Sequence, residues 1–432
     1  MFLTPNVDQT LAGIQGLSMA SRWGRSQIQA FQNGRLRRLV HHACERVPYY
    51  RCLFQEAGLR SQDIRGVEDL ERIPITTRQT LQSLPVQDLV ARGFDVGKLV
   101  VHRTSGSSGE PLNIRRTVFE DRLLQAHRLK VLLNLGMRWT DRRTAVVTAR
   151  KEPSRVFRRL GLLRYQEIDC LEPPEKILRA LRASPPQVLR GFPGTLSWLA
   201  GFIRDEDRAV IQPRIIVTDS ESLTDEMRAR IEGAFGARVT DFYDSHEFNM
   251  IAWECSAGGL YHVSDLSVIA EVLKDGKPAA EGEDGELVAT ALHSWAMPFI
   301  RFRLGDLVTR GPAMCRCGTE NTTIERVQGR LMDRFEFPDG TTLHPYRLVR
   351  PLLSENSWIQ RFQIVQETAD RILVNIVPLE MEKTTVAAVA CVEAALASAL
   401  GGAAKVTVRL IHEIPPSPNG KFRPYYSKLK ML

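Results

Sequence analysis

Between Lys98 and Asp244 the chain alternates short apolar runs with amphipathic stretches, and this alternation limits the fold more than any other feature. The runs "KLVVHRT", "TAVVTAR", "QVLRGF", "RIIVTD" and "ARVTDFYD" are typical of strands. The stretches "TVFEDRLLQAHRLKVLLNLGM", "PGTLSWLAGFIRD" and "LTDEMRARIEGAFG" between them are typical of helices. Because parallel strands need a crossover, usually a helix, we expect parallel βαβ units in an α/β fold.

After Asp244 the pattern changes to strands joined by polar turns. The runs "GLYHVSDLSVIAEVL", "GELVATALH" and "FIRFRLGDLV", with turns such as "KDGKP" and "EGEDGE", predict an antiparallel or barrel-like sheet. Residues 1 to about 75 are expected to be helical, and the tail beyond "GRLMDRFEFPDGT" has an α+β pattern. We therefore expect a large N-terminal domain over residues 1–328, which holds both sheets. A small, mobile α+β C-terminal domain should cover residues 329–432.

The composition is that of an ordinary globular protein, with 43% apolar and 25% charged residues. The net charge of +8 includes basic clusters such as "NGRLRR", but no aromatic residues alternate with them, so no nucleic-acid partner is expected. Seven scattered cysteines disfavour a disulfide scaffold. The N-terminus lacks the pattern of a signal peptide, and the 16-residue run "TVAAVACVEAALASAL" contains Glu393, which favours a buried helix over a membrane span. We expect a cytoplasmic protein.

A loop of small and hydroxyl-bearing residues follows the first expected strand. It consists of Thr104, Ser105, Gly106, Ser107, Ser108 and Gly109. Such a loop can hold a phosphate through backbone N–H groups and hydroxyls, or it can be a Gly/Ser linker. It is neither of the two best-known phosphate loops, because every Gly-Lys pair is followed by Leu, Pro or Phe and no G-x-G-x-x-G follows a strand.

Further candidate residues stand at strand ends and in loops. "DFYDSHE" places Tyr243 and Glu247 at the end of an expected parallel strand, where α/β sheets bind ligands. "RFRLGDL" supplies Arg303 and Asp306. The others lie later in the chain: Arg330 in "GRLMD" and Lys421 in "PSPNGKFRP".

The order of these motifs resembles that of the adenylate-forming superfamily, and the chain is most similar to its phenylacetate–coenzyme A ligase branch. The motifs that carry the resemblance are "RTSGSSGEPL", "GFPGTLSWLA", "DSESLTDEMR", "FYDSHE", "MPFIRFRLGDL", "MCRCG", "GRLMD" and "PNGKFRP". The resemblance implies a reaction in two halves. A carboxylate attacks the α-phosphorus of MgATP to give an acyl-adenylate and pyrophosphate, and a thiol or an amine then displaces AMP.

The resemblance also implies residue roles in catalysis. The loop Thr104–Gly109 would hold the triphosphate, and Lys421 would bring positive charge to the α-phosphate from a loop of the small domain. Glu247 would bind magnesium. The alternatives are an exposed hairpin lysine for Lys421 and a salt bridge at a strand end for Glu247.

Five residues are implied to bind the nucleotide: Ser220, Glu221, Tyr243, Asp306 and Arg330. An ionised aspartate accepts both ribose hydroxyls well, and Tyr243 offers a ring face to adenine, although a buried strand tyrosine is commonplace. "DSES" supplies Ser220 and Glu221 as the expected adenine contacts. Arg303 is expected to serve in packing or in an ion pair instead.

The chain departs from the family pattern at three places. Asp244 stands where the family usually has glycine, and His246 where it usually has serine or threonine. The imidazole of His246 would then take the place of a hydroxyl that faces the α-phosphate or the carboxylate, so we count it among the catalytic residues. Met332 stands at the usual hinge position, with Asp333 one residue later.

Three thiols and one imidazole form a candidate zinc set: Cys255, His262, Cys315 and Cys317. Four such ligands make a closed tetrahedral site without a position for catalysis. From spacing alone the alternative is buried, inert cysteines. Because the "EC…GG…H" and "C-x-CG" patches recur in the branch, the resemblance favours a structural zinc.

The expected function is therefore activation of a small, aromatic carboxylate with ATP and transfer to coenzyme A, with release of AMP. The acid pocket is expected beside "FYDSHEF". Transfer to an amine, a hydroxyl or a carrier protein is the first alternative, and a non-catalytic nucleotide-binding protein is the second. The expected partners are the acid, ATP and coenzyme A, without a membrane. The sequence leaves a homodimer open.

Overall fold

The computed structural model describes residues 23–103, 112–147, 164–330, 335–343, 345, 348, 352, 358–414 and 425–430. The chain forms two compact units. The first consists of Met1–Gly136 and Phe242–Gln328, and the second of Met137–Asp241 and Gly329–Leu432. The boundary expected between residues 328 and 329 stays a prediction.

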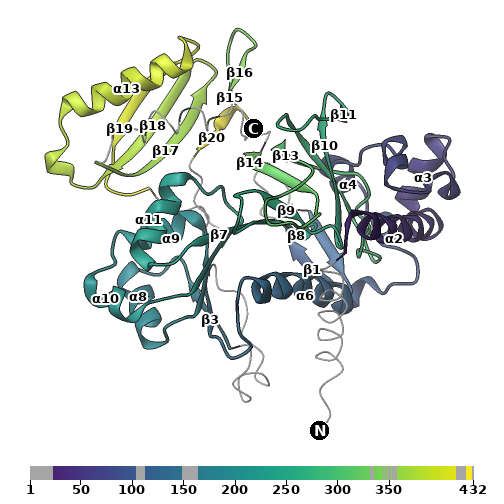
Figure 1. Cartoon of the computed structure of the whole chain (residues 1–432). Coiled ribbons are helices and arrows are strands. Elements are labelled where there is room, and N and C mark those ends of the chain that lie inside the picture. The colour runs from purple at the N-terminus through teal and green to yellow at the C-terminus, as the bar shows by residue number, and fades with distance from the viewer. Residues whose placement is uncertain are drawn as a thin grey trace. The chain divides into compact units, whose positions relative to one another are not determined.

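The first unit begins with two adjacent helices, α2 (Arg25–Arg46) and α3 (Pro48–Glu56) (Figure 1). Their apolar faces are buried in one cluster that includes Leu36, Leu39 and Phe54. Shorter elements follow: η1 (Ser61–Asp63), η2 (Val67–Arg72), α4 (Arg78–Gln82), α5 (Val86–Leu89), η3 (Val96–Lys98), and the hairpin of β1 (Val100–Arg103) and β2 (Asn113–Arg116).

Helix α6 (Val118–Asn134) follows β2 directly, because Thr117 caps it. The Thr117 hydroxyl accepts a hydrogen bond from the Glu120 N–H, and the Glu120 carboxylate accepts one from the Thr117 N–H. This reciprocal cap satisfies two N–H groups that a helix start leaves without partners.

The second unit contains the predicted parallel strands. These are β3 (Arg143–Val147), β4 (Tyr165–Asp169), β5 (Val188–Gly191), β6 (Ile215–Asp219) and β7 (Val239–Ser245), which continues into the first unit. The helices are α8 (Pro174–Ala183), α9 (Pro193–Ala200), α10 (Asp205–Val210) and α11 (Asp225–Phe235). The α/β class with parallel βαβ units is thus confirmed, although β4 was not anticipated. The expectation that "KLVVHRT" belongs to these units was wrong, because its described part, β1, pairs antiparallel with β2 in a separate two-stranded sheet.

The strands after β7 are antiparallel, as predicted. They are β8 (Asn249–Glu254), β9 (Tyr261–Val263), β10 (Val268–Lys274), β11 (Lys277–Pro278), β12 (Asp284–Ala291), β13 (Phe302–Arg310) and β14 (Thr323–Arg330). The complete strand order is β11-β10-β12-β13-β14-β9-β8-β7-β6-β5-β3-β4. The prediction of a single strand over "GLYHVSDLSVIAEVL" was wrong, because this run forms the two strands β9 and β10. A tight turn splits it, in which the Ser267 N–H donates to the Ser264 carbonyl at 2.6 Å.

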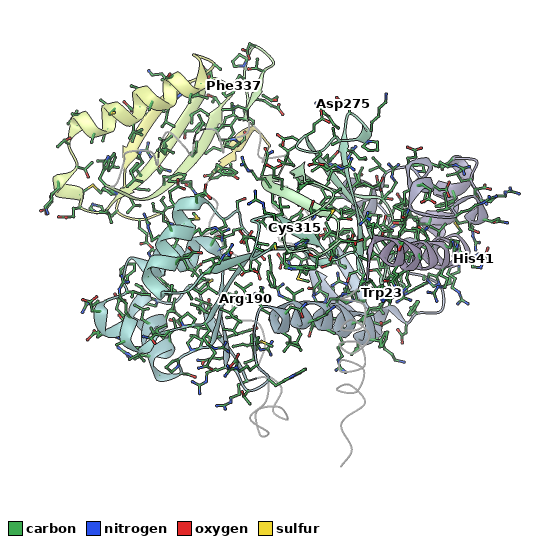
Figure 2. The ribbon with its side chains drawn as sticks, viewed as in Figure 1. Trp23, His41, Arg190, Asp275, Cys315 and Phe337 are labelled. Carbon is green, nitrogen blue, oxygen red and sulfur yellow. The ribbon has the colours of Figure 1, made fainter. Side chains whose placement is uncertain are left out.

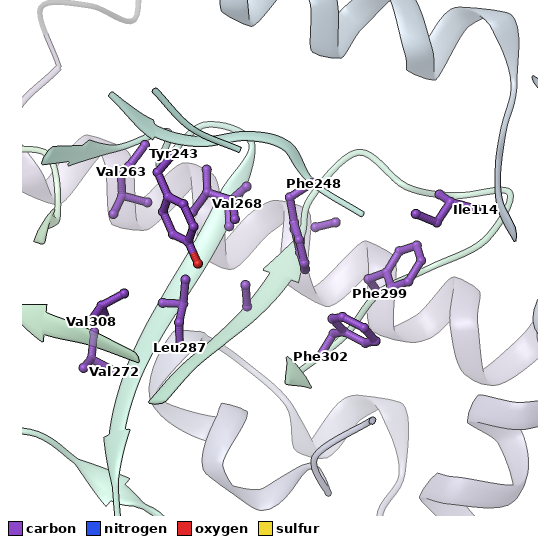
Figure 3. Close-up of a cluster of buried hydrophobic side chains, with 14 of the residues drawn as sticks. Ile114, Tyr243, Phe248, Val263, Val268, Val272, Leu287, Phe299, Phe302 and Val308 are labelled. Carbon is purple, nitrogen blue, oxygen red and sulfur yellow. The ribbon is translucent and has the colours of Figure 1, made fainter. Parts of the chain in front are cut away.

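An aromatic cluster anchors the antiparallel strands of the first unit (Figure 3). Phe248 lies with its ring centroid 6.0 Å from that of Phe299 and 6.2 Å from that of Phe302. Tyr243 belongs to the same cluster. Burial of a large apolar side chain stabilises a fold by about 1.5–3 kcal/mol, so the segment from Tyr243 to Phe248 is held in place at both ends.

The C-terminal part of the second unit has the predicted α+β composition. Its elements are β15 (Phe335–Glu336), β16 (Thr342–Leu343), β17 (Ile359–Thr368), β18 (Arg371–Pro378), η5 (Met381–Lys383), α13 (Val386–Leu400), β19 (Lys405–Leu410), β20 (Tyr425–Ser427) and η6 (Lys428–Lys430). Four strands form a sheet in the order β19-β18-β17-β20, and α13 lies along one face of it (Figure 1).

The expectation that α13 is a buried helix was only partly right. Val392, Leu396 and Leu400 are buried, whereas Val386 is 87% exposed. A helix that covers one face of a sheet buries only the side that faces the strands, and small alanines tolerate exposure on the other side. Among the described residues, no helix combines the length and the apolar character that a membrane crossing requires.

Acid is expected to destabilise the first unit through His293. Its Nδ1 lies 2.7 Å from the Arg35 guanidinium and its Nε2 lies 2.8 Å from the Leu266 carbonyl, so the neutral ring donates from Nε2. Burial, and then the charge of Arg35, lower the pKa of His293 to about 4. Because this is below the value of about 6.5 in an unfolded chain, stability is complete above about pH 6.5 and falls towards pH 4.

The loss that His293 causes should reach on the order of 3 kcal/mol in the free energy of unfolding, measured by urea titration at pH 7.5 and pH 4.5. His293→Gln should lose less over the same interval. Equal losses in both proteins would contradict the assignment to His293.

Candidate functional site

The turn between β7 and β8 carries two of the predicted catalytic residues, His246 and Glu247. β7 ends at Ser245, whose hydroxyl accepts a hydrogen bond from the Phe248 N–H at 3.2 Å. β8 begins at Asn249, whose φ of 63° is left-handed, a conformation that asparagine adopts more readily than most residues. The turn therefore has a defined backbone, and the burial of Phe248 fixes its end.

Three arginines from different elements bind this segment. Arg78 of α4 donates to Oε1 of Glu247 at 2.6 Å. Arg116 of β2 donates to the carbonyl oxygens of His246 at 2.5 Å and of Glu247 at 2.8 Å. Arg128 of α6 donates to Oδ2 of Asp244 at 3.0 Å. The partner of Asp244 is thus a cation, which offsets the charge of this half-buried carboxylate.

The carboxylate of Glu247 is buried, with a side chain only 3% exposed, and it pairs with Arg78. This ion pair is the salt bridge that the sequence left open as the alternative role. The residue still fits a magnesium ligand, because Mg²⁺ typically binds one or two carboxylates together with phosphate oxygens. A metal at this carboxylate requires that Arg78 release Oε1 or that the metal bind the other oxygen.

Tyr243 and Asp306 lie in contact, as the nucleotide-site interpretation requires. The Tyr243 hydroxyl donates to Oδ2 of Asp306 at 2.5 Å. Tyr243 is buried and Asp306 half-buried, so the bond orients a carboxylate that water or a ligand can still reach. Arg303 pairs with Glu286 at 3.0 Å, in line with the ion-pair role expected for it.

The predicted adenine contacts Ser220 and Glu221 lie in the second unit, directly after β6. Ser220 has a φ of 67°, a left-handed conformation that is uncommon and costs energy for a non-glycine residue. The Glu221 carboxylate accepts a hydrogen bond from the Gly194 N–H at 3.0 Å, at the first turn of α9. Asp219, just before them, forms a two-point ion pair with Arg190 at 2.6 and 3.0 Å.

Several predicted residues lie outside the described residues. These are the loop Thr104–Gly109, the hinge residues Met332 and Asp333, and Lys421. Arg330 ends β14, and its side chain also lies outside the described part of the chain. Their roles stay predictions.

The four predicted zinc ligands of the first unit do lie together, and Figure 2 labels one of them, Cys315. The ligand atoms of Cys255, His262, Cys315 and Cys317 all lie within 4.8 Å of one another. The Cys315 and Cys255 sulfurs are 3.7 Å apart, and the Cys317 sulfur is 3.3 Å from Nε2 of His262. Two sulfurs, each about 2.3 Å from a tetrahedral zinc, are separated by about 3.8 Å. The geometry therefore fits a closed zinc site.

The surroundings of the cluster act differently on its ligand atoms. Burial raises the pKa of the Cys255 thiol to about 11. Burial also acts against the Cys317 thiolate, but hydrogen bonds with Thr319, Cys315 and Cys255 together outweigh it and lower the pKa of Cys317. Among the described residues, the buried Nδ1 of His262 has no hydrogen-bond partner. The other ring nitrogen, Nε2, faces the thiols, so the imidazole can offer it to a metal.

A pocket of about 340 Å³ lies in the second unit, and the sequence did not predict it. Apolar residues such as Trp198, Met227 and Phe362 line it together with Arg230 and Arg361. Glu226 and Glu413 also line it, and their charges act on Arg230 and Arg361, so the pocket has an apolar body and a polar part of mixed charge. Its lining comes from α9, α11, β17, β18 and residues 412–414, so no local motif marks it.

Comparisons with known proteins agree with this architecture. Residues 335–428 match the family model of the CapK C-terminal domain. The chain is 27% identical to phenylacetate–coenzyme A ligase of Thermus thermophilus over 368 residues, which cover 79% of this chain and 78% of that protein. It is also 27% identical to phenylacetate–coenzyme A ligase of Escherichia coli, with 71% and 72% covered.

Among solved structures, 2-hydroxyisobutyryl-CoA ligase in the postadenylation state, in complex with R3-HIB-AMP, has a TM-score of 0.79. The match covers 94% of this chain and 91% of that one at 21% identity, and it shows the fold. By sequence, the chain is thus similar to phenylacetate–coenzyme A ligases over more than two thirds of its length, and residues 335–428 are similar to the CapK C-terminal domain.

Proposed function

We propose that the protein is an ATP-dependent acid–coenzyme A ligase that works through an acyl-adenylate. The observation that carries the proposal is the contact between Tyr243 and Asp306. Tyr243 lies in β7, and Glu247 follows two residues after the end of that strand. Tyr243 and Asp306 come from separate strands, β7 and β13, and the fold joins the two residues to which the resemblance assigns adenine and ribose.

In the first half-reaction, a carboxylate oxygen of the acid attacks the α-phosphorus of ATP and pyrophosphate leaves. Asp306 would accept the ribose hydroxyls, and Tyr243 would hold that carboxylate in position through its hydroxyl. Glu247 would bind magnesium, which neutralises charge on the phosphate oxygens. Lys421 and His246 would donate hydrogen bonds to the α-phosphate or to the attacking carboxylate.

In the second half-reaction, the thiol of coenzyme A attacks the acyl carbon of the adenylate. The thioester forms, the bond between the acyl carbon and the phosphate oxygen breaks, and AMP leaves. The thiol proton passes to solvent or to AMP. The names of the two curated relatives support coenzyme A as the acceptor.

The acid is proposed to be small and aromatic, as in the phenylacetate–coenzyme A ligases. The structure changes one part of the pocket expected beside "FYDSHEF". Phe248 packs against Phe299 and Phe302 in the core, so it supports the turn instead of offering an open face (Figure 3). Tyr243, the half-buried His246 and the adjoining strand residues are left as candidate walls.

The acid and the acceptor can be tested together. We expect thioester when the protein is incubated with MgATP, coenzyme A and phenylacetate or benzoate. We also expect at least about tenfold less with a short aliphatic acid such as 2-hydroxyisobutyrate, because burying a ring contributes about 1.5–3 kcal/mol. Liquid chromatography with mass detection identifies the products. An adenylate that persists with coenzyme A and disappears on adding an amine or a carrier protein would contradict coenzyme A as the acceptor.

We further propose that the cluster of Cys255, His262, Cys315 and Cys317 binds a structural zinc. Its support is the geometry of four ligand atoms within 4.8 Å of one another. A four-ligand site leaves no open position for water, so the metal would stabilise the loop after β13 and take no part in the chemistry. The cytoplasm is the proposed location.

A further inference from the structure

We propose that Arg116 is a positioning residue for the magnesium ligand: it fixes the main chain of His246 and Glu247, and with it the direction of the Glu247 carboxylate. The inference rests on the role proposed for Glu247. It concerns a residue that belongs to none of the motifs by which the chain resembles its family.

Arg116 is the last residue of β2 and is only 2% exposed. One nitrogen of its guanidinium donates to the carbonyls of two consecutive residues, His246 at 2.5 Å and Glu247 at 2.8 Å. Two adjacent carbonyls ordinarily point in different directions along a chain. Their convergence on one donor therefore defines the backbone of the turn, and the direction in which the Glu247 side chain leaves it.

Acidic neighbours keep the Arg116 guanidinium in place. Its other terminal nitrogen lies 4.0 Å from Oδ1 of Asp121, which also accepts a hydrogen bond from His102 at 2.8 Å. Burial lowers the pKa of Arg116, and the charges of Asp121, Glu247 and Glu120 act against that effect. A guanidinium titrates above about pH 12 in water, so Arg116 stays charged at neutral pH.

Two arginines thus act on Glu247 at different atoms, and the difference defines their roles. Arg78 binds the carboxylate itself, so a metal at that carboxylate competes with it. Arg116 binds only the carbonyls of the turn, and these bonds can persist while the carboxylate changes partners. Arg116 is therefore the cation that can hold Glu247 in the same place before and after a metal binds.

The test compares nucleotide binding with and without metal, by calorimetry on the full chain. Arg116→Met removes both hydrogen bonds, and Arg116→Lys returns one ammonium that can reach a carbonyl. Arg301→Met is the matched control. Arg301 is also buried, and one of its nitrogens donates to two carbonyls, those of Glu71 at 2.9 Å and Ile73 at 2.7 Å, far from the β7–β8 turn in sequence.

Arg116→Met should raise the Kd of MgATP about tenfold and leave the Kd of ATP in EDTA within about twofold, since two charge-assisted hydrogen bonds hold the metal ligand. Arg116→Lys should recover part of the affinity for MgATP. Arg301→Met should lower the melting temperature and leave the ratio of the two Kd values unchanged.

Two outcomes would overturn the inference in distinguishable ways. In the first, Arg116→Met lowers the melting temperature and leaves the ratio of the Kd values for MgATP and for ATP in EDTA unchanged, which would show that Arg116 is structural only. Where the methionine variant does not fold, the same result with Arg116→Lys gives the same conclusion. If the unaltered protein binds ATP equally well with magnesium and with EDTA, the role proposed for Glu247 fails, and the inference fails with it.

Discussion

Replacing Lys421 by alanine is expected to lower acyl-adenylate formation by at least about a hundredfold, the usual cost of losing one group that stabilises charge in a transition state. Negative charge builds on the α-phosphate as the carboxylate attacks, and the lysine would be the cation supplied by the C-terminal segment. Exchange of labelled pyrophosphate into ATP measures this half-reaction alone.

The same variant should still convert a supplied acyl-adenylate and coenzyme A into thioester, because in that step the thiol attacks the acyl carbon and no bond forms at the α-phosphorus. Lys428→Ala is the matched control, since Lys428 is an exposed lysine of the same segment that pairs with Glu367 at 3.1 Å. It should behave as the unaltered protein. Equal loss of both half-reactions in Lys421→Ala, or exchange at the normal rate, would contradict the assigned role.

The second large effect is expected at the zinc cluster. We expect about one equivalent of zinc by elemental analysis of the purified protein. Cys315→Ser should lose most of this zinc and melt roughly 5–10 °C lower, because the binding energy of a structural metal is part of the folding energy. Calorimetry measures the melting, and metal analysis of the same sample gives the zinc content.

Cys391→Ser is the control for this experiment, since Cys391 is an exposed cysteine of α13 outside the cluster. It should keep both the zinc and the melting temperature. A metal-free preparation of the unaltered protein that melts at the same temperature as the zinc-loaded protein would refute a structural zinc. It would leave the cysteines as thiols without a metal, two of them buried and Cys317 exposed.

The fold was largely predictable because the hydrophobic pattern is local. Parallel strands such as "RIIVTD" and helices such as α11 have the expected limits, since strand and helix periods differ within a few residues. The split between β9 and β10 was not predictable in this way. The turn that separates them depends on Asp265, whose carboxylate accepts from the Thr322 N–H at 2.6 Å, a partner 57 positions later.

In the candidate site, too, residues in local sequence motifs could be predicted, whereas residues that act through contacts far apart in the sequence could not. Tyr243, Glu247 and Asp306 could be proposed because they stand in recognisable motifs, although Asp306 lies within β13 and not at the strand-to-turn transition expected for it. Arg78, Arg116 and Arg128 were missed, because arginines are frequent in this chain and nothing local distinguishes these three. They bind Glu247 and Asp244, which lie 169, 131 and 116 positions away along the chain, and only the fold brings these residues into contact.

The central claim is that the protein forms an acyl-adenylate, and acid-dependent exchange of labelled pyrophosphate into ATP tests it most directly. The assay needs neither the acceptor nor the second half-reaction. The account predicts label in ATP when MgATP and a small aromatic acid are both present, and none when the acid or magnesium is omitted. Absence of exchange with every acid of a broad panel, with ATP still bound, would contradict the claim and favour a nucleotide-binding protein without catalysis.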